Sequence, residues 1–158
     1  MTTLLETEVI ADNADRVLIH ELIASARSNV PLRTNPALDA LQAVFVHGSP
    51  GAVTLRFSAS IHSVQGNGVI AGGTLTSMLD FGMAFAVLSK LPPAKTCATI
   101  SLTVNMQAPA QVGDFLVEAN ATRVGGRVAF VRAELYDAER TRPIAEAVAS
   151  FAVLEVMG

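Results

Sequence analysis

Residues 65–88 read QGNGVIAGGTLTSMLDFGMAFAVL, and this stretch decides the fold. It opens as a glycine-studded loop at 65–73. The segment from about Thr74 to Leu88 is then apolar on nearly every side. A helix that is apolar all round is normally buried. The sequence therefore predicts a central helix at 74–88, covered by the rest of the chain and preceded by Gly72 and Gly73.

Strand-like segments lie on both sides of this helix. Upstream, 43–47 and 53–57 flank a Gly-Ser-Pro-Gly turn, which is typical of a hairpin. Downstream, four further segments alternate apolar and polar residues and are joined by short turns: 98–106, 115–124, 127–137 and 144–156. We expect an α+β domain in which an antiparallel sheet covers the helix.

The amino-terminal part of the chain predicts a separate, smaller unit of structure. Residues 12–28 have the apolar spacing of an amphipathic helix, and 29–36 contains two prolines and reads as a connector. A chain of 158 residues has the length of one domain. We therefore expect residues 1–39 to add a helix and connector to a main domain at 40–158.

Composition excludes several classes of protein. Hydrophobic residues make up 51% of the chain and charged residues 16%, which excludes a disordered chain and favours a buried contact between copies. A net charge of −3 without a basic block argues against nucleic-acid binding. Residues 57–89 contain too many glycines and polar side chains for a membrane span.

The cysteine count and the first residues bear on location and metals. Cys97 is the only cysteine, so an intrachain disulfide and a cysteine-rich metal site are impossible. Residues 1–6 lack the basic start of a secretory signal. His20, His47 and His62 are scattered and form no metal-binding spacing. We expect a cytoplasmic protein without a metal.

Asp80 is the residue that does not fit its surroundings. It is the only Asp, Glu, Lys or Arg between 57 and 89, and it lies in the middle of the apolar helix. Burying a carboxylate without partners is costly. Two interpretations stay open: Asp80 faces solvent or makes a structural hydrogen bond, or it acts as a catalytic acid or base.

Gly72 and Gly73 open the helix and are candidates for binding a negative charge. The first N–H groups of a helix have no partner within it, and the helix dipole favours anions there. Such an N–H could stabilise the oxyanion of an acyl-transfer reaction. An ordinary glycine-rich turn is the alternative interpretation.

The spacing of Gln65, Gly72 and Asp80 resembles the active-site signature of hotdog-fold acyl-CoA thioesterases. The patterns nearest to it are those of PaaI-like enzymes of the phenylacetate pathway and of 4-hydroxybenzoyl-CoA thioesterases. The segment from Thr99 to Ala110 is similar to the family's central strand, and Arg123–Arg127 to its following hairpin. The resemblance covers roughly residues 40–156.

The resemblance implies a fold, an assembly and a set of roles. The fold would be an antiparallel sheet wrapped around a long helix, and the chains would form homodimers or homotetramers with active sites between subunits. Asp80 would be the general base or the nucleophile, the Gly72 N–H the oxyanion donor, and Gln65 and Thr99 would orient the carbonyl, the water or the carboxylate. The remaining expected substrate contacts are Gly73, Asn67, Arg123 and Arg127.

The reaction implied is hydrolysis of an acyl-CoA thioester, with coenzyme A entering as part of the substrate and no other cofactor. Many family members have a His where this chain has Ala71, so a non-catalytic domain that binds acyl-CoA is the alternative. A hydratase of the same fold would carry a His five residues after Asp80, where this chain has Phe85. We set that activity aside.

Overall fold

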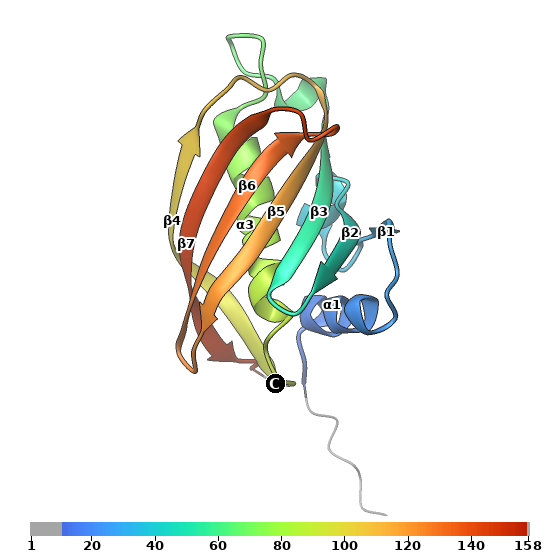
Figure 1. The fold of residues 1–158 in the computed structure, drawn as a ribbon, viewed down its shortest axis with the longest axis vertical. Coiled ribbons are helices and arrows are strands. Elements are labelled where there is room, and N and C mark those ends of the chain that lie inside the picture. The colour runs from blue at the N-terminus through green and yellow to red at the C-terminus, as the bar shows by residue number, and fades with distance from the viewer. Residues whose placement is uncertain (1–10, 158) are drawn as a thin grey trace, which may run out of the picture.

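The computed structural model describes residues 11–157, so the expectations for residues 1–10 lie outside the described part. A seven-stranded antiparallel sheet curves around one long helix, α3 (Gly72–Leu88), in the order β1-β2-β3-β5-β6-β7-β4 (Figure 1). This confirms the predicted α+β arrangement. The other elements are α1 (Ala14–Ala24), β1 (Val30–Pro31), α2 (Pro36–Ala40), β2 (Val44–Ser49), β3 (Ala52–Ala59), η1 (Ile61–Ser63), β4 (Lys95–Met106), β5 (Gly113–Val124), β6 (Val128–Asp137) and β7 (Pro143–Glu155).

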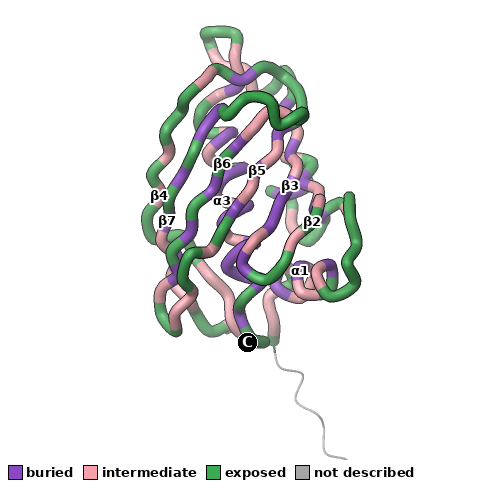
Figure 2. Tube along the Cα trace, viewed as in Figure 1, coloured by how far each residue is buried: buried purple, intermediate pink, exposed green. Residues whose placement is uncertain are grey.

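The sheet buries one face and exposes the other, as its sequence alternation predicts. In β6, Val131, Ala133 and Leu135 are buried, whereas Arg132 and Glu134 between them are exposed. Successive side chains of a strand point to opposite faces, so this pattern places the first set against α3. Along β5 and β7, buried residues alternate in a similar way with half-buried or exposed ones (Figure 2).

Helix α3 packs closely on the middle of the sheet. A Cβ at Gly82 would lie 2.5 Å from Cγ1 of Val117 on β5, a distance that side-chain atoms do not tolerate. Gly82 therefore lets the helix approach the strand. This close contact holds α3 in one position, and so fixes where Gly72 and Asp80 lie relative to β4.

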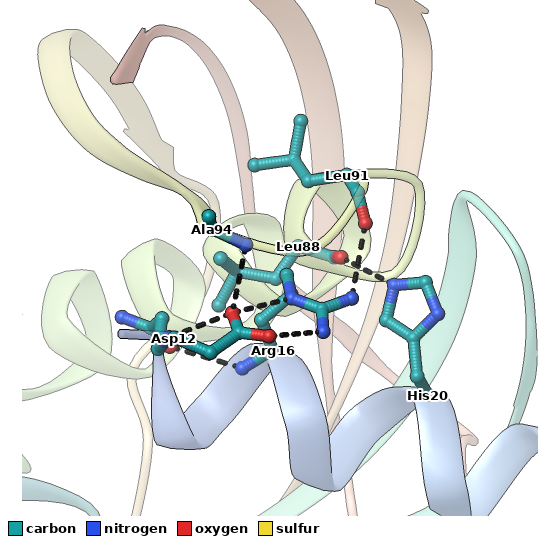
Figure 3. A network of polar contacts seen from close by, with 7 residues as sticks. Asp12, Arg16, His20, Leu88, Leu91 and Ala94 are labelled. Atoms are coloured by element: carbon teal, nitrogen blue, oxygen red, sulfur yellow. Dashed lines mark hydrogen bonds and ion pairs between the residues drawn. The ribbon is translucent and has the colours of Figure 1, made fainter. Parts of the chain in front are cut away.

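Helix α1 secures the carboxyl-terminal end of α3 (Figure 3). Arg16 donates to both carboxylate oxygens of Asp12 and, through Nη1, to the carbonyl oxygen of Leu91 at 3.3 Å. His20 Nε2 lies 3.0 Å from the carbonyl oxygen of Leu88, the last residue of α3. The carbonyls at a helix end lack partners within the helix, and cations there are favourable.

The hydrogen-bonding partners of Asp12 lower the pKa of its carboxyl group. Hydrogen bonding to Arg16, reinforced by the backbone N–H groups of Asn13 and Ala94, lowers the pKa of Asp12 to about 2. The Arg16 side chain is almost fully buried, so the ion pair lies in a site of low solvent exposure. A charged pair of this kind links α1 to the loop after α3.

The helix boundaries differ from the sequence prediction in three places. Helix α3 begins at Gly72, two residues early. Helix α1 ends at Ala24 and not at residue 28, because Ala26 adopts a left-handed conformation with φ 52°. The predicted connector contains β1 and leads into the short α2, where the Asn35 side chain accepts from the N–H of Leu38 and Pro36 occupies the first turn.

Candidate active site

Asp80 lies on the side of α3 that faces β4, the open edge of the sheet. Thr99 Oγ1 on β4 donates a hydrogen bond to Asp80 Oδ1 at 2.7 Å. Asp80 is half-buried, and among the described residues no Lys, Arg or His forms an ion pair with it. The site therefore contains a carboxylate that is oriented by one hydroxyl and reachable from the edge of the sheet.

Cys97 lies near this carboxylate but is not a candidate nucleophile. Its Sγ is 3.9 Å from the carbonyl oxygen of Ala84, one helical turn after Asp80. Burial, and to a lesser extent the negative charges of Asp80 and Asp15, raise the pKa of the Cys97 thiol to about 12. The thiolate is the reactive form of cysteine, and it is scarce at neutral pH here.

The amino-terminal end of α3 presents free donors. Ala71 precedes the helix and makes no side-chain cap. The N–H groups of Gly72 and Gly73 donate to no described residue, and both glycines are exposed. Such N–H groups at a helix start suit a negatively charged oxygen. They are therefore the groups in this region that could stabilise an oxyanion.

Gln65 and Gly72 lie on the wall of one cavity of about 360 Å³. Leu75 of α3 and Met106, the last residue of β4, form part of the same wall. Asp80 is not among the residues that line this cavity. The structure thus brings two of the predicted residues together at the start of α3 and leaves the carboxylate farther along the helix.

Gln65 is hydrogen-bonded within the loop that precedes α3. Gln65 Oε1 accepts from the N–H of Asn67 at 2.5 Å, and the Gln65 N–H donates to the carbonyl oxygen of Val69 at 2.9 Å. Asn67 is exposed in the turn between them. In this conformation Gln65 Oε1 stabilises the turn, whereas Gln65 Nε2 donates to no described residue and is available to a carbonyl oxygen.

The two predicted arginines lie at the other end of the sheet. The carbonyl oxygen of Arg127 accepts from the N–H of Val153 near the end of β7, and Arg123 is on β5 beside the same hairpin. Met106, by contrast, pairs with Ala145 near the start of β7. Within one chain, therefore, Arg123 and Arg127 are remote from Gly72.

Gly72 and Asp80 are also too far apart to act on one carbonyl within a single chain. They are eight residues apart on α3, and a rise of 1.5 Å per residue separates them by about 12 Å along the helix axis. Reacting atoms have to approach to about 3–3.5 Å. A site that uses both residues therefore has to take them from different copies of the chain.

Sequence reasoning missed one residue of this region, Met106. It lies in the predicted alternation of 98–106, in line with Leu102 and Val104, but only the folded chain brings it beside Gly72. A Cβ at Gly72 would lie 3.5 Å from Met106 Cε. The strand pattern predicts on which face of the sheet Met106 lies, whereas its contact with Gly72 depends on where β4 ends.

Two further properties concern metals and membranes. No three His, Cys, Asp or Glu side chains within residues 11–157 are grouped so that they could hold a metal ion. In the same part of the chain, no helix has the length and apolar character needed to cross a membrane.

Comparison with known proteins identifies the family. The sequence pattern of the Thioesterase superfamily matches residues 67–144. A protein of Pseudomonas aeruginosa that is named as an esterase is 31% identical over 112 residues, which cover 68% of this chain and 82% of that one.

Solved structures agree with the sequence comparison. A phenylacetic acid degradation-related protein of Ralstonia eutropha, titled as a thioesterase, has a TM-score of 0.72 and 25% identity over 85% of this chain and 98% of that one. A Streptococcus mutans protein bound to acetyl CoA has a TM-score of 0.64 and 16% identity, with 72% and 90% of the two chains covered. The chain described here has the hotdog fold and belongs to the thioesterase superfamily.

Proposed function

We propose that this protein hydrolyses acyl-CoA thioesters to a free acid and coenzyme A. The observation that carries the proposal is the Asp80–Thr99 pair at the open edge of the sheet, in a chain of the thioesterase superfamily. The acetyl CoA bound to the Streptococcus mutans neighbour supports coenzyme A as the leaving group. No cofactor besides the substrate takes part in the proposed reaction.

Asp80 acts on the thioester carbonyl in one of two ways. As a general base it removes a proton from water, the hydroxyl oxygen bonds to the carbonyl carbon, and the C–S bond then breaks, with the proton passing to the sulfur. As a nucleophile it bonds to the carbonyl carbon itself, expels the thiolate, and leaves an anhydride that water hydrolyses. Thr99 orients the carboxylate in both routes.

The Gly72 N–H is the proposed donor to the oxyanion. In either route the carbonyl oxygen becomes negative, and a donor fixed at a helix start stabilises that charge without reorganising. Gln65 contacts the carbonyl or the attacking water through its side-chain Nε2. Gly73 and Asn67 line the approach of the substrate.

The complete site contains parts of two copies, because Gly72 and Asp80 of one chain are about 12 Å apart on one helix. β4 is at the end of the sheet, its pairing side away from β7 is open, and Ile100 on it is 58% exposed. An open edge of this length is suited to pairing with another strand. We propose a two-fold homodimer in which Asp80 of the partner subunit reaches Gly72; homotetramers would be pairs of such dimers.

The same dimer gives Arg123 and Arg127 a role. Antiparallel pairing of two β4 strands reverses the direction of the second copy. The hairpin of the partner subunit then lies toward the end at which Gly72 is found. Guanidinium groups bind phosphates well, so these arginines are proposed to contact the phosphates of coenzyme A.

A reducing compartment such as the cytoplasm suits a chain with a single cysteine.

The test is release of free thiol from acetyl-, hexanoyl-, decanoyl- and benzoyl-CoA by the wild type and by Asp80→Asn. The substitution keeps the size of the side chain and an oxygen that can accept from Thr99. We expect turnover by the wild type and a loss of about a hundredfold or more in the variant, whose thermal unfolding stays the same. An absence of thiol release, together with tight acyl-CoA binding by both proteins, would instead identify a non-catalytic binding domain.

An isotope experiment detects the nucleophilic route. A single turnover with excess enzyme in ¹⁸O-labelled water places label in the product acid if Asp80 is a base, and also if water attacks the acyl carbonyl of the anhydride. If Asp80 is the nucleophile, label enters the Asp80 carboxylate when water attacks the aspartyl carbonyl, and mass spectrometry of the peptide detects it.

A further inference from the structure

The cavity beside Gly72 has the lining of an acyl-binding pocket. Apart from Gln65 and Gln107, its wall consists of glycine, alanine, proline and apolar side chains, and no charged residue of the described chain lines it. Its volume of about 360 Å³ is near the lower end of the range for small-molecule sites. A group bound here would be small and uncharged.

Met106 differs from the buried apolar side chains of this wall. Ile70 and Leu75 are each 3% exposed and belong to the core, whereas Met106 is 45% exposed at the end of β4. A methionine side chain is unbranched and has three rotatable bonds, so it adapts to what it contacts. Met106 is therefore the exposed large apolar side chain of this wall, and core packing does not fix its conformation.

Met106 also lies where the pocket meets the proposed reaction centre. Its Cε is 3.5 Å from the position that a Cβ of Gly72 would occupy. A thioester whose carbonyl oxygen accepts from the Gly72 N–H would have its first acyl carbons close to this methyl group.

We propose that this cavity receives the acyl group and that Met106 sets the length of chain accepted. The inference rests on the proposed function and names its substrate class: apolar acyl groups of short to medium length, or those with a single aromatic ring. Acyl groups that end in a carboxylate are poor substrates, because the apolar wall offers that charge no partner.

The experiment compares kcat/KM for hexanoyl-, decanoyl-, benzoyl- and glutaryl-CoA among Met106 variants. Met106→Ala enlarges the cavity, Met106→Phe reduces it, and Met106→Leu conserves volume. We expect Met106→Ala to raise the decanoyl-to-hexanoyl ratio about tenfold or more, and Met106→Phe to lower it. Met106→Leu is expected to keep the wild-type decanoyl-to-hexanoyl ratio. For the wild type and for each of the three variants, glutaryl-CoA is expected to be the poorest substrate.

Val148→Ala is the matched control. Val148 is 59% exposed on the opposite face of the sheet, so the change also removes exposed apolar surface but leaves the cavity intact. The decanoyl-to-hexanoyl ratio of kcat/KM for Val148→Ala should equal that of the wild type. Thermal unfolding and native mass of each variant show that fold and assembly persist.

The outcomes separate this inference from the proposed function. Active enzymes whose chain-length profile is the same in Met106→Ala and Met106→Phe overturn the role of Met106 and leave thioester hydrolysis standing. An equal fall in kcat/KM for every substrate also overturns the role of Met106, because selection by chain length has to change the ratio of kcat/KM between substrates. A wild type that releases no thiol from any substrate overturns both.

Discussion

At the scale of single residues, the proposed reaction depends on one backbone N–H. Gly72 is the first residue of α3, and its N–H bonds to no described residue, so it is available to a ligand. A side chain added there meets only Met106 Cε at an ordinary contact distance. The N–H can therefore be removed, or kept beside an added methyl group, with little effect on the fold.

Gly72→Pro removes this donor, whereas Gly72→Ala keeps it. Proline is favoured at the first helical position, and Ala71 already has the extended backbone that precedes a proline, with φ −59° and ψ 138°. We expect Gly72→Pro to fold normally and to lose about 10²–10³-fold in kcat, the usual effect of removing an oxyanion donor. Gly72→Ala should retain more activity than Gly72→Pro; equal activity in the two variants would show that the N–H takes no part.

At the scale of elements, the position of α3 depends on its contact with β5. Gly82→Ala would place a methyl group 2.5 Å from Val117 Cγ1. We expect it to lower the free energy of unfolding by about 2 kcal/mol through overpacking, as measured by urea denaturation.

The control for this contact is a double-mutant cycle. Val117→Ala removes the atom in conflict, so Gly82→Ala should cost much less in that background than in the wild type. Strictly additive effects would mean that the strain of Gly82→Ala arises elsewhere.

The link between α1 and α3 should weaken in acid. The pKa of Asp12 is lowered to about 2 from an ordinary 3.8, so the folded state favours the carboxylate. Its contribution is complete above about pH 4 and is lost as pH falls toward 2, because the unfolded chain takes up the proton first. Asp12→Asn should reduce the free energy of unfolding by about 2 kcal/mol at pH 7, the range for hydrogen bonds to charged groups.

The measurement compares the two proteins by urea denaturation between pH 7 and pH 2.5. The wild type and Asp12→Asn are expected to converge as pH falls, since protonated Asp12 resembles asparagine. A difference that stays constant over this range would contradict the assigned role of the ion pair with Arg16.

At the scale of the whole molecule, sequence periodicity predicted the architecture but only part of the site. The apolar run around Asp80 predicted a buried helix, and alternation predicted the strands that cover it. Short elements such as β1 and α2 carry too few residues to show a period. Their boundaries depend on local contacts, such as the Asn35 cap.

The candidate site could be predicted where it follows chain spacing, and not where it depends on distant contacts. Gln65, Gly72 and Asp80 could be selected because their spacing resembles the active-site signature of hotdog-fold thioesterases. Met106 beside Gly72 depends on the lengths of β4 and α3, which spacing does not supply. The distance between Gly72 and Asp80 becomes informative only once both are known to lie on one helix, and it then supports the proposal of a site shared by two chains.

The most direct test of the central claim uses a heterodimer of Asp80→Asn and Gly72→Pro chains, co-expressed with two tags and purified through both. If each site takes Asp80 from one subunit and Gly72 from the other, one of its two sites combines an intact Asp80 with an intact Gly72. We expect both homodimers to be nearly inactive, whereas the heterodimer should release thiol at about half the wild-type rate. A heterodimer as inactive as its parents would contradict a site shared between two copies of the chain.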